Sequence, residues 1–280
     1  MVHGLASNAR MWDACAEALA RAGVTCVAVD LRGHGRTAVS QAGRAGPHGT
    51  PTAAADVSAL VDVLRADGTL PGPVVLAGQS WGGNVVLTAA ASGARVDALA
   101  LVDGGWLRFD RDEPFERLWA RLAPPTWDGT TWDELTARLR PVLDGWGPHA
   151  VPAVLANLTT RPDGSVRNVL APQAHEHILR SMYDDDPRPS YPRVRVPVLL
   201  APAGGGPASA LVDEAVAALP DAVLRRYDDA HHDLHLQHPA RLAADLLDLL
   251  DRARARPVHA PQRHTDDTTD GTTDDESEDR

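Results

Sequence analysis

Strand-like and helix-like segments alternate along most of this chain, and this alternation constrains its fold more than any other feature. Nearly continuous apolar runs predict five strands, at residues 24–30, 73–78, 97–103, 196–201 and 222–227. Such runs are typical of strands buried on both faces, as in a parallel sheet covered by helices. Apolar residues recur at helical spacing between them, at residues 8–22, 52–66, 81–92, 209–219 and 239–254. We therefore expect an α/β fold with a mostly parallel, doubly wound sheet.

Residues 105–195 interrupt this alternation and are predicted to form a helical cap inserted into the sheet domain. They contain many Pro, short helical patterns and five Trp: Trp106, Trp119, Trp127, Trp132 and Trp146. The α/β core would then comprise residues 1–104 and 196–256. Residues 257–280 are predicted to be a disordered acidic tail, because their Thr- and Asp-rich end has no apolar residue to offset the entropy of ordering.

The composition excludes several classes of function. All 27 basic residues are Arg, which excludes lysine Schiff-base chemistry and a P-loop lysine. The formal net charge of −11 argues against nucleic acid or an acidic membrane as a partner. Cys15 and Cys26 are expected to be small buried hydrophobes in a reducing cytoplasm. No apolar run reaches the roughly 18 residues of a spanning helix, and no export signal is recognisable.

The segment Gly78-Gln79-Ser80-Trp81-Gly82 matches the G-x-S-x-G pattern of a nucleophile elbow. It follows an apolar run and precedes a helix rich in small residues. In this motif the serine lies on a sharp strand-to-helix turn, and the flanking glycines make room for nearby backbone. The helix N-terminus also favours negative charge beside the serine. Ser80 is therefore the candidate nucleophile, and a Gly-rich turn with a capping Ser is the alternative.

A serine nucleophile needs a base from elsewhere in the chain, and His232 is the preferred candidate among twelve histidines. It follows the last predicted strand and precedes the last helix, at the sheet edge where such folds place functional residues. The run that includes His231, His235 and His238 also resembles a set of metal ligands, but no Glu or Cys completes a zinc pattern. A solvated or capping histidine is the other alternative.

Asp103 is the candidate for the carboxylate that orients the histidine. It ends the strand predicted at residues 97–103 and would lie at the same sheet edge as Ser80. A turn aspartate before Gly104 and Gly105 is the alternative interpretation.

These motifs together resemble the α/β-hydrolase superfamily with a serine nucleophile. His3-Gly4-Leu5 resembles the family's His-Gly oxyanion motif, and residues 30–36 resemble its D-x-R-G-x-G loop. Residues 229–239 resemble its histidine segment. The matches follow the family order from residue 3 to about residue 254.

The resemblance implies a role for each matching residue. Ser80 would be the nucleophile and His232 the general base, and the backbone N–H groups of Leu5 and Trp81 would form the oxyanion hole. Many relatives carry their acid in a loop after the strand that follows the cap. Residues 202–207 occupy that place here and have no carboxylate. This favours Asp103 as the acid, with two weaker candidates, Asp213 and Asp229.

The resemblance also implies a strand that the given sequence does not contain. In the family, three strands precede the His-Gly motif, and the third lies between the strands expected here at residues 24–30 and 73–78. Only Met1 and Val2 precede His3. The two strands would lack their shared neighbour and leave buried backbone groups unpaired. We therefore expect an N-terminally shortened form of the fold.

The expected function is cleavage of a carboxylic ester or similar acyl bond in a small molecule, through a Ser-His-Asp triad and an acyl-enzyme, without a cofactor or metal. The Trp-rich cap suggests a largely apolar pocket. The alternatives are a proline-iminopeptidase-like enzyme, a carbon–carbon bond hydrolase, a cofactor-free haloperoxidase-like enzyme, or a non-catalytic ligand-binding protein. An aminopeptidase would need an acidic group in the cap to hold an ammonium, and Glu113, Glu116 and Glu134 are available.

Overall fold

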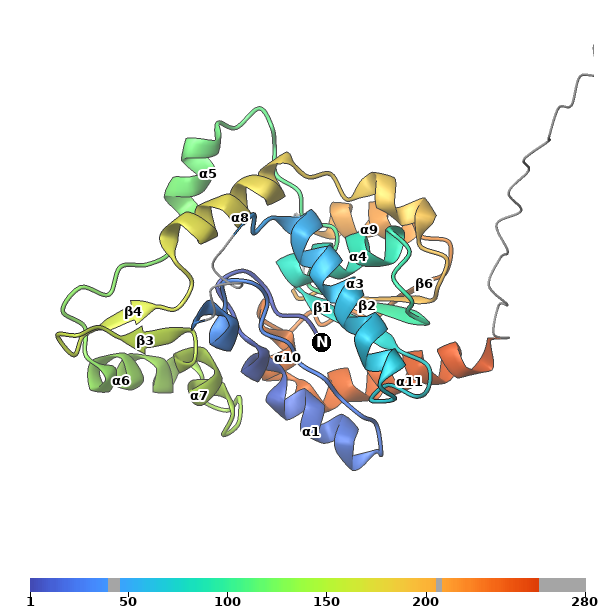
Figure 1. The fold of residues 1–280 in the computed structure, drawn as a ribbon, viewed down its shortest axis with the longest axis horizontal. Coiled ribbons are helices and arrows are strands. Elements are labelled where there is room, and N and C mark those ends of the chain that lie inside the picture. The colour runs from blue at the N-terminus through green and yellow to red at the C-terminus, as the bar shows by residue number, and fades with distance from the viewer. Residues whose placement is uncertain (40–45, 205–207, 257–280) are drawn as a thin grey trace, which may run out of the picture.

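A four-stranded parallel sheet forms the centre of the molecule, as the sequence predicts (Figure 1). The computed structural model describes residues 1–39, 46–204 and 208–256. The strands lie in the order β1-β2-β5-β6, and every neighbouring pair is parallel. Their bounds are β1 Val75–Gln79, β2 Ala98–Val102, β5 Val198–Ala201 and β6 Ala222–Leu224. The first three strands end in register, so residues that follow them meet at one edge.

Helices cover both faces of the sheet, because alternate strand residues point to opposite sides. In β2, Leu99 and Leu101 lie in one apolar core with α3, α4 and α9. Ala98, Ala100 and Val102 lie in a second core with α1 and α11. The bounds of these helices are α1 Asp13–Arg21, α3 Thr50–Ala66, α4 Trp81–Ala91, α9 Ala208–Ala218 and α11 Pro239–Ala255. Short helices precede α1 and α11: η1 Ala9–Trp12 and α10 Leu234–Gln237.

The chain between β2 and β5, which we call the insertion, is mainly helical. It also contains an antiparallel hairpin that was not expected from the sequence. Its elements are α5 Phe115–Leu122, α6 Trp132–Val142, α7 Ala150–Leu155, β3 Leu158–Thr160, β4 Val166–Asn168, α8 Pro172–Asp184 and η3 Arg188–Arg193. The cap boundaries at residues 105 and 195 stay predictions.

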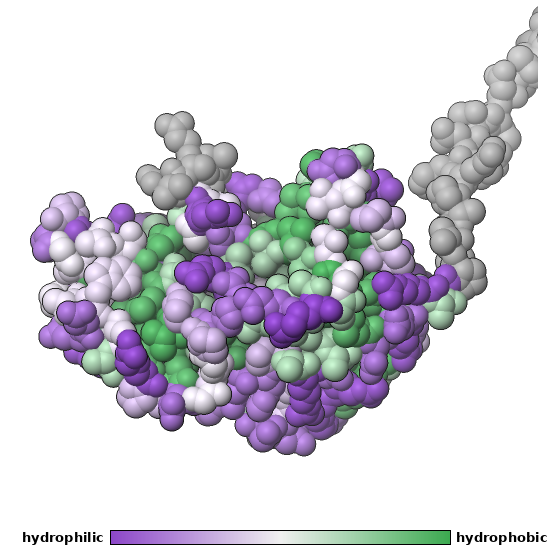
Figure 2. Space-filling view, turned by 90° about the horizontal axis from the view of Figure 1, so that it is seen from below, coloured by the Kyte–Doolittle hydropathy of each residue, from purple (hydrophilic) through white to green (hydrophobic). Residues whose placement is uncertain are grey.

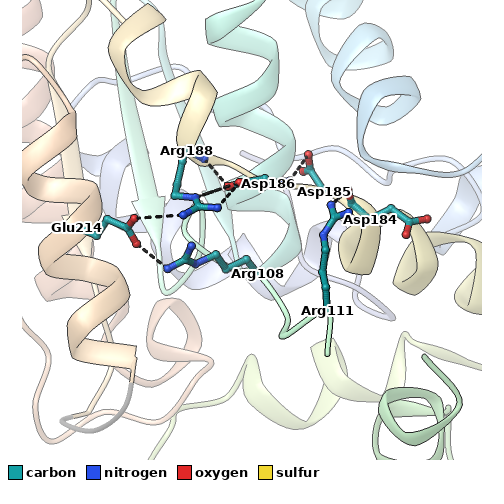
Figure 3. Close-up of polar contacts among 7 residues, drawn as sticks. All are labelled: Arg108, Arg111, Asp184, Asp185, Asp186, Arg188 and Glu214. Carbon is teal, nitrogen blue, oxygen red and sulfur yellow. Dashed lines mark hydrogen bonds and ion pairs between the residues drawn. The ribbon is translucent and has the colours of Figure 1, made fainter. Parts of the chain in front are cut away.

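Charged side chains join both ends of the insertion to α9 (Figure 3). Glu214 on α9 accepts a hydrogen bond from Arg108, which lies after β2, at 2.8 Å. The same carboxylate lies 3.9 Å from Arg188 in η3, near the start of β5. Arg188 also forms an ion pair of 2.6 Å with Asp186. The network therefore holds the two segments that connect the sheet to the insertion side by side. We call these segments the crossings.

The prediction of a strand at residues 24–30 is wrong, because the structure has only an isolated bridge there, from Val29 to Val2. A strand needs a neighbour along its length. Val2 lies between this segment and β1 and bridges both. Its N–H donates to the oxygen of Ala77 at 2.8 Å, and its oxygen accepts from Gln79 at 3.0 Å. Met1 also pairs with this segment, because its oxygen accepts from Val29 at 3.2 Å. Two residues thus supply a small part of the pairing that a whole strand would supply.

An apolar cavity of about 110 Å³, which we call the strand slot, lies beside Val2. It separates β1 from the segment at residues 24–30, which were expected to lack a strand between them. The N-terminal amine of Met1 donates to the oxygen of Val27 at 2.7 Å. Burial lowers the pKa of this amine to about 6. The facing walls of the slot include Val24, Val27 and Val29 on one side and Val75, Leu76 and Ala77 on the other.

The outer surface is mixed, and apolar residues lie in hollows between hydrophilic ones on the face shown in Figure 2. Large hydrophobic side chains are exposed at Val63, Leu122 and Val142, on three different helices. Isolated exposures of this kind are normal for a folded domain. Among the described residues, no helix combines the length and apolar character needed to cross a membrane. The predicted acidic tail lies outside the described residues.

The two cysteines are free thiols in different surroundings. Cys15 on α1 is buried, as expected, and burial raises the pKa of its thiol to about 12. Cys26 is half-buried, and burial raises the pKa of its thiol as well. Neither thiol is therefore a ready nucleophile near neutral pH.

Candidate active site

Ser80 lies on a sharp turn between β1 and α4, with φ 55° and ψ −126°. Side-chain-bearing residues rarely adopt this backbone conformation, which costs about 1–3 kcal/mol. Two backbone hydrogen bonds hold it: the N–H of Ser80 donates to Val102 at 2.9 Å, and its oxygen accepts from Gly83 at 2.8 Å. A Cβ added to Gly104 would lie 2.0 Å from the Ser80 oxygen, so only glycine permits this approach. The turn therefore presents Ser80 at the carboxyl edge of the sheet.

The His-Gly segment lies directly against this turn. A Cβ added to Gly4 would lie 2.9 Å from the Ser80 Cβ. The buried ring of His3 fixes the segment, because Nδ1 donates to the Gly4 oxygen at 2.8 Å and Nε2 accepts from the N–H of Leu31 at 3.0 Å. Burial lowers the pKa of His3 to about 4, so the ring is neutral at pH 7.

The N–H groups of Leu5 and Trp81 are available to a ligand. In the described part of the chain, neither makes a backbone hydrogen bond. Trp81 is the first residue of α4, where N–H groups have no partner within the helix. Their role as oxyanion donors stays a prediction.

His232 and Asp103 meet at the same edge. The Nδ1 of His232 donates to Oδ2 of Asp103 at 2.6 Å. The other oxygen of Asp103 accepts from the N–H of Ala203 at 3.0 Å, which orients the carboxylate. The side-chain amide of Gln79 donates to the backbone oxygen of His232 at 3.1 Å. The histidine loop is thus tied both to β2 and to the residue before Ser80.

The protonated form of His232 is favoured by its neighbours. Partial burial lowers the pKa of the ring, but the hydrogen bond and charge of Asp103, together with the charge of Asp233, outweigh this and raise the pKa above its usual value. The side chain remains 53% exposed. Among the described residues, Ser80 Oγ makes no hydrogen bond to His232. Catalytic contacts of this kind often tighten only when substrate binds.

The weaker candidates for the acid have other partners. Asp213 binds Arg226 at 3.2 Å, and Asp229 lies 3.7 Å from Arg241. The N–H of His231 donates to the Gln237 side chain at 2.7 Å. Of these groups, none contacts the His232 ring.

The other histidines of the segment lie in different surroundings. His235 is fully buried beside Trp12, with ring centroids 4.7 Å apart, and His238 lies 3.9 Å from Asp229. Among the described residues, no group of three or more His, Cys, Asp or Glu is placed to hold a metal ion.

A cleft of about 1200 Å³ lies between the sheet domain and the insertion. Its walls come from the segments near residues 8–13, 28–38 and 156–177. Arg36 and Arg167 line it beside apolar residues such as Leu158 and Val169, and among the described residues that line it none is a Trp. Ser80 is not among its lining residues.

The chain matches a family model described as the alpha/beta hydrolase family over residues 1–245. Among curated proteins it is similar to Lipase LipV from Mycobacterium tuberculosis, at 33% identity over 159 residues, which are 56% of this chain and 54% of that protein. The chain thus spans about half the length of the curated relative that it matches.

Similar solved structures include the peroxisomal alpha-beta-hydrolase Lpx1 from Saccharomyces cerevisiae. Its TM-score is 0.71 at 16% identity, over 93% of this chain and 78% of that chain. A thermophilic esterase from Thermogutta terrifontis has a TM-score of 0.65 at 21% identity over 90% of this chain and 88% of that chain. At these identities the similarity shows the fold. Because the family model spans most of its length, the chain belongs to the alpha/beta hydrolase family.

Proposed function

We propose that this protein is a serine hydrolase that cleaves carboxylic esters or similar acyl bonds of small molecules. Ser80 is the nucleophile, His232 the general base and Asp103 the acid that orients the histidine. The contact of 2.6 Å between His232 and Asp103 carries the proposal. These residues are 129 positions apart and meet beside a serine held in a strained turn. The match to a lipase supports the same reaction class.

The reaction follows from these positions. Ser80 Oγ attacks the carbonyl carbon of the substrate while His232 Nε2 takes the hydroxyl proton. The resulting oxyanion is stabilised by the N–H groups of Leu5 and Trp81. The tetrahedral intermediate collapses, His232 gives its proton to the departing alcohol, and an acyl-enzyme remains. A water molecule, deprotonated by His232, then attacks the acyl carbon. The second tetrahedral intermediate collapses, His232 returns the proton to Ser80 Oγ, and the acid is released.

Two features of the site set the expected efficiency. Each oxyanion donor contributes about 3 kcal/mol to the stabilisation of the transition state. Proton transfer requires Ser80 Oγ and His232 Nε2 to approach to about 3 Å. Asp103 and Gln79 hold the histidine loop in place. We therefore expect the two atoms to approach by rotation of their side chains rather than by movement of the loop.

The aminopeptidase alternative has less support from the insertion. Glu113 is bound to Arg121, and Glu134 forms a capping box with Thr131 at the start of α6. Two of the three acidic residues that could hold a substrate ammonium are therefore engaged locally.

Hydrolysis of short p-nitrophenyl esters and labelling by a fluorophosphonate test the proposal. We expect ester turnover, and a label that mass spectrometry locates on Ser80. Ser80→Ala should abolish both, while Ser92→Ala, at the exposed end of α4, should leave both unchanged. Labelling at another residue would contradict the nucleophile assignment. Ester binding without turnover in the unmodified protein would favour the non-catalytic alternative.

A further inference from the structure

Gln79 is the last residue of β1 and directly precedes Ser80, yet its polar side chain is buried. The residue is 2% exposed. Its backbone N–H donates to the oxygen of Val2 at 3.0 Å, so the side-chain amide is the group without a role in the sheet. Burying a polar amide is costly unless its hydrogen bonds are made. The contacts of this amide therefore indicate what it does.

The two ends of the amide contact two different segments. Nε2 of Gln79 donates to the backbone oxygen of His232 at 3.1 Å. A carbonyl oxygen only accepts, so the nitrogen end faces His232 and the oxygen end faces away from it. That oxygen lies against Gly4, because a Cβ added to Gly4 would be 2.7 Å from Oε1. Any side chain at position 4 would displace the amide, so this glycine keeps room for Gln79 as well as for Ser80.

The backbone of His232 has few other restraints. In the described part of the chain, its N–H and its oxygen make no hydrogen bond except the one from Gln79. Asp103 holds only the ring, through Nδ1 at 2.6 Å. Residues 228–232 are exposed or half-buried, so packing does not replace a lost bond. Without the Gln79 donor, the ring would stay attached to Asp103 while the backbone could shift.

A shift of this backbone would move the atom on which the proposed reaction depends most. His232 Nε2 takes the proton of Ser80 Oγ and later gives a proton to the departing alcohol. Proton transfer needs the heavy atoms within about 3 Å, and a misplacement of about 1 Å can cost roughly a hundredfold in rate. Since Gln79 belongs to the same turn as Ser80, its side chain sets the distance between this turn and the histidine loop.

We propose that Gln79 is a positioning residue, which holds His232 at the distance that proton transfer to and from Ser80 needs. The inference rests on the proposed hydrolase function and deepens it. The role belongs to the amide donor rather than to the volume of the side chain. Gln79 acts through His232 and not on the substrate.

The dependence on the leaving group tests this role. Gln79→Met keeps the length of the side chain and removes the donor. The p-nitrophenyl and methyl esters of one short acid are compared by kcat per active site, titrated to completion with a fluorophosphonate. p-Nitrophenolate departs without a proton, whereas methoxide needs one from His232. We expect kcat to fall about tenfold for the p-nitrophenyl ester and about a hundredfold for the methyl ester, with KM changed less than about twofold.

Two further variants complete this comparison. Gln79→Asn retains an amide but is one methylene too short to reach the His232 oxygen, so it should show the same pattern and replaces Gln79→Met if that variant does not fold. Gln173→Met, the same substitution at an exposed position of α8, should leave both esters unaffected. An equal loss for the two esters, or no loss, would overturn the proposal, because a packing defect does not distinguish leaving groups.

A double-mutant cycle tests whether Gln79 acts through the histidine. In His232→Ala, the remaining turnover of the p-nitrophenyl ester depends on the oxyanion donors and on binding. Adding Gln79→Met should then change kcat by less than about twofold. A further tenfold loss would overturn the proposal, because the amide would then act on Ser80 or on the oxyanion segment.

Amide hydrogen exchange separates the positioning role from the hydrolase function, because it needs no substrate. The N–H groups of Ala230 and His231 are hydrogen-bonded within the histidine loop. In Gln79→Met we expect faster exchange at both, and unchanged exchange in β2. Unchanged exchange in the loop would overturn the positioning role while ester turnover stands. If the unmodified protein hydrolyses no ester, the proposed function fails, and the exchange data still show whether Gln79 holds the loop.

Discussion

Asp103 contacts one nitrogen of the His232 ring and thereby controls proton uptake at the other. Its hydrogen bond and charge raise the pKa of His232 against the opposing effect of burial. In the proposed mechanism the neutral ring is the base, so activity is expected to fall as the pH drops through this raised pKa. We predict an acid limb of kcat/KM above pH 6.5, the usual pKa of histidine.

Asp103→Asn should move this acid limb to lower pH and reduce kcat by roughly a hundredfold or more, because the ring loses its charge partner and its orientation. The pH–rate profile of an ester substrate checks both effects. Asp229→Asn is the matched control, since Asp229 does not contact the ring, and it should leave the profile in place. An unchanged limb in Asp103→Asn would contradict the assignment.

His235 contributes to acid sensitivity rather than to catalysis. Its ring is fully buried, neither ring nitrogen has a hydrogen-bond partner, and burial lowers its pKa to about 4 despite the opposing charge of Asp233. In the unfolded chain the pKa of His235 is about 6.5. As the pH falls, the unfolded chain therefore binds this proton at a higher pH than the folded chain does. Stability is complete above pH 6.5 and is lost between there and pH 4, by roughly 3 kcal/mol from this residue.

His235→Phe should remove this loss, because it keeps a ring beside Trp12 and cannot be protonated. Urea unfolding at pH 7 and pH 4 measures the difference in unfolding free energy. His3 is also buried with a lowered pKa, so part of the acid loss should remain in the variant. His231→Phe, in the exposed part of the same loop, should keep the full loss. An equal loss in His235→Phe would contradict the prediction.

The sequence predicts individual residues where a motif or a strand end gives their position. The elbow pattern marks Ser80, and the sheet edge explains why Asp103 and His232 were expected beside it. No pattern marks Gln79, because its role depends on a loop far away in the chain. Gln79 is the variable position of the motif, and only the folded path of the histidine loop shows its contact.

Among the elements, the network around Glu214 makes a testable contribution to the position of the insertion. Glu214→Gln removes the charge that Arg108 and Arg188 share. These side chains are partly exposed, so we expect a loss of only about 0.5–1 kcal/mol in unfolding free energy. Amide hydrogen exchange should rise at both crossings, near residues 105–111 and 186–193. Asp251→Asn, in an exposed pair with Arg254 on α11, should leave exchange there unchanged. Unchanged exchange in Glu214→Gln would contradict the role.

Two errors in the predicted elements have physical causes. The apolar pattern at residues 24–30 indicates burial but cannot show whether a neighbouring strand is present. Among the described residues, only Val2 bridges this segment. The hairpin β3–β4 has strands of three residues each, too short for a recognisable alternation. Its turn contains Asp163-Gly164, a common hairpin signal, with Gly164 at φ 84°. This dipeptide is the sequence signal that indicates the hairpin.

In the whole molecule, the sheet is supported unequally on the two sides of β1. Two apolar cores on opposite faces hold β1, β2 and β5 together, and their carboxyl ends carry Ser80, Asp103 and the residues that orient them. On the other side of β1, Val2 alone provides pairing before the strand slot opens. The edge that carries Ser80 is therefore less well supported on this side than towards β2.

An engineered extension of five alternating Val and Thr residues ahead of Met1 should fill the strand slot. It would pair with β1 and with the segment at residues 24–29, and it would replace the buried N-terminal amine of Met1 by an amide. We expect a gain of about 1 kcal/mol or more, seen as a rise in Tm of about 2–4 °C. An extension of Gly and Ser of equal length also replaces this amine but has no apolar side chains to fill the slot. If both extensions raise Tm equally, the gain comes from the amine alone, and the slot does not accept a strand.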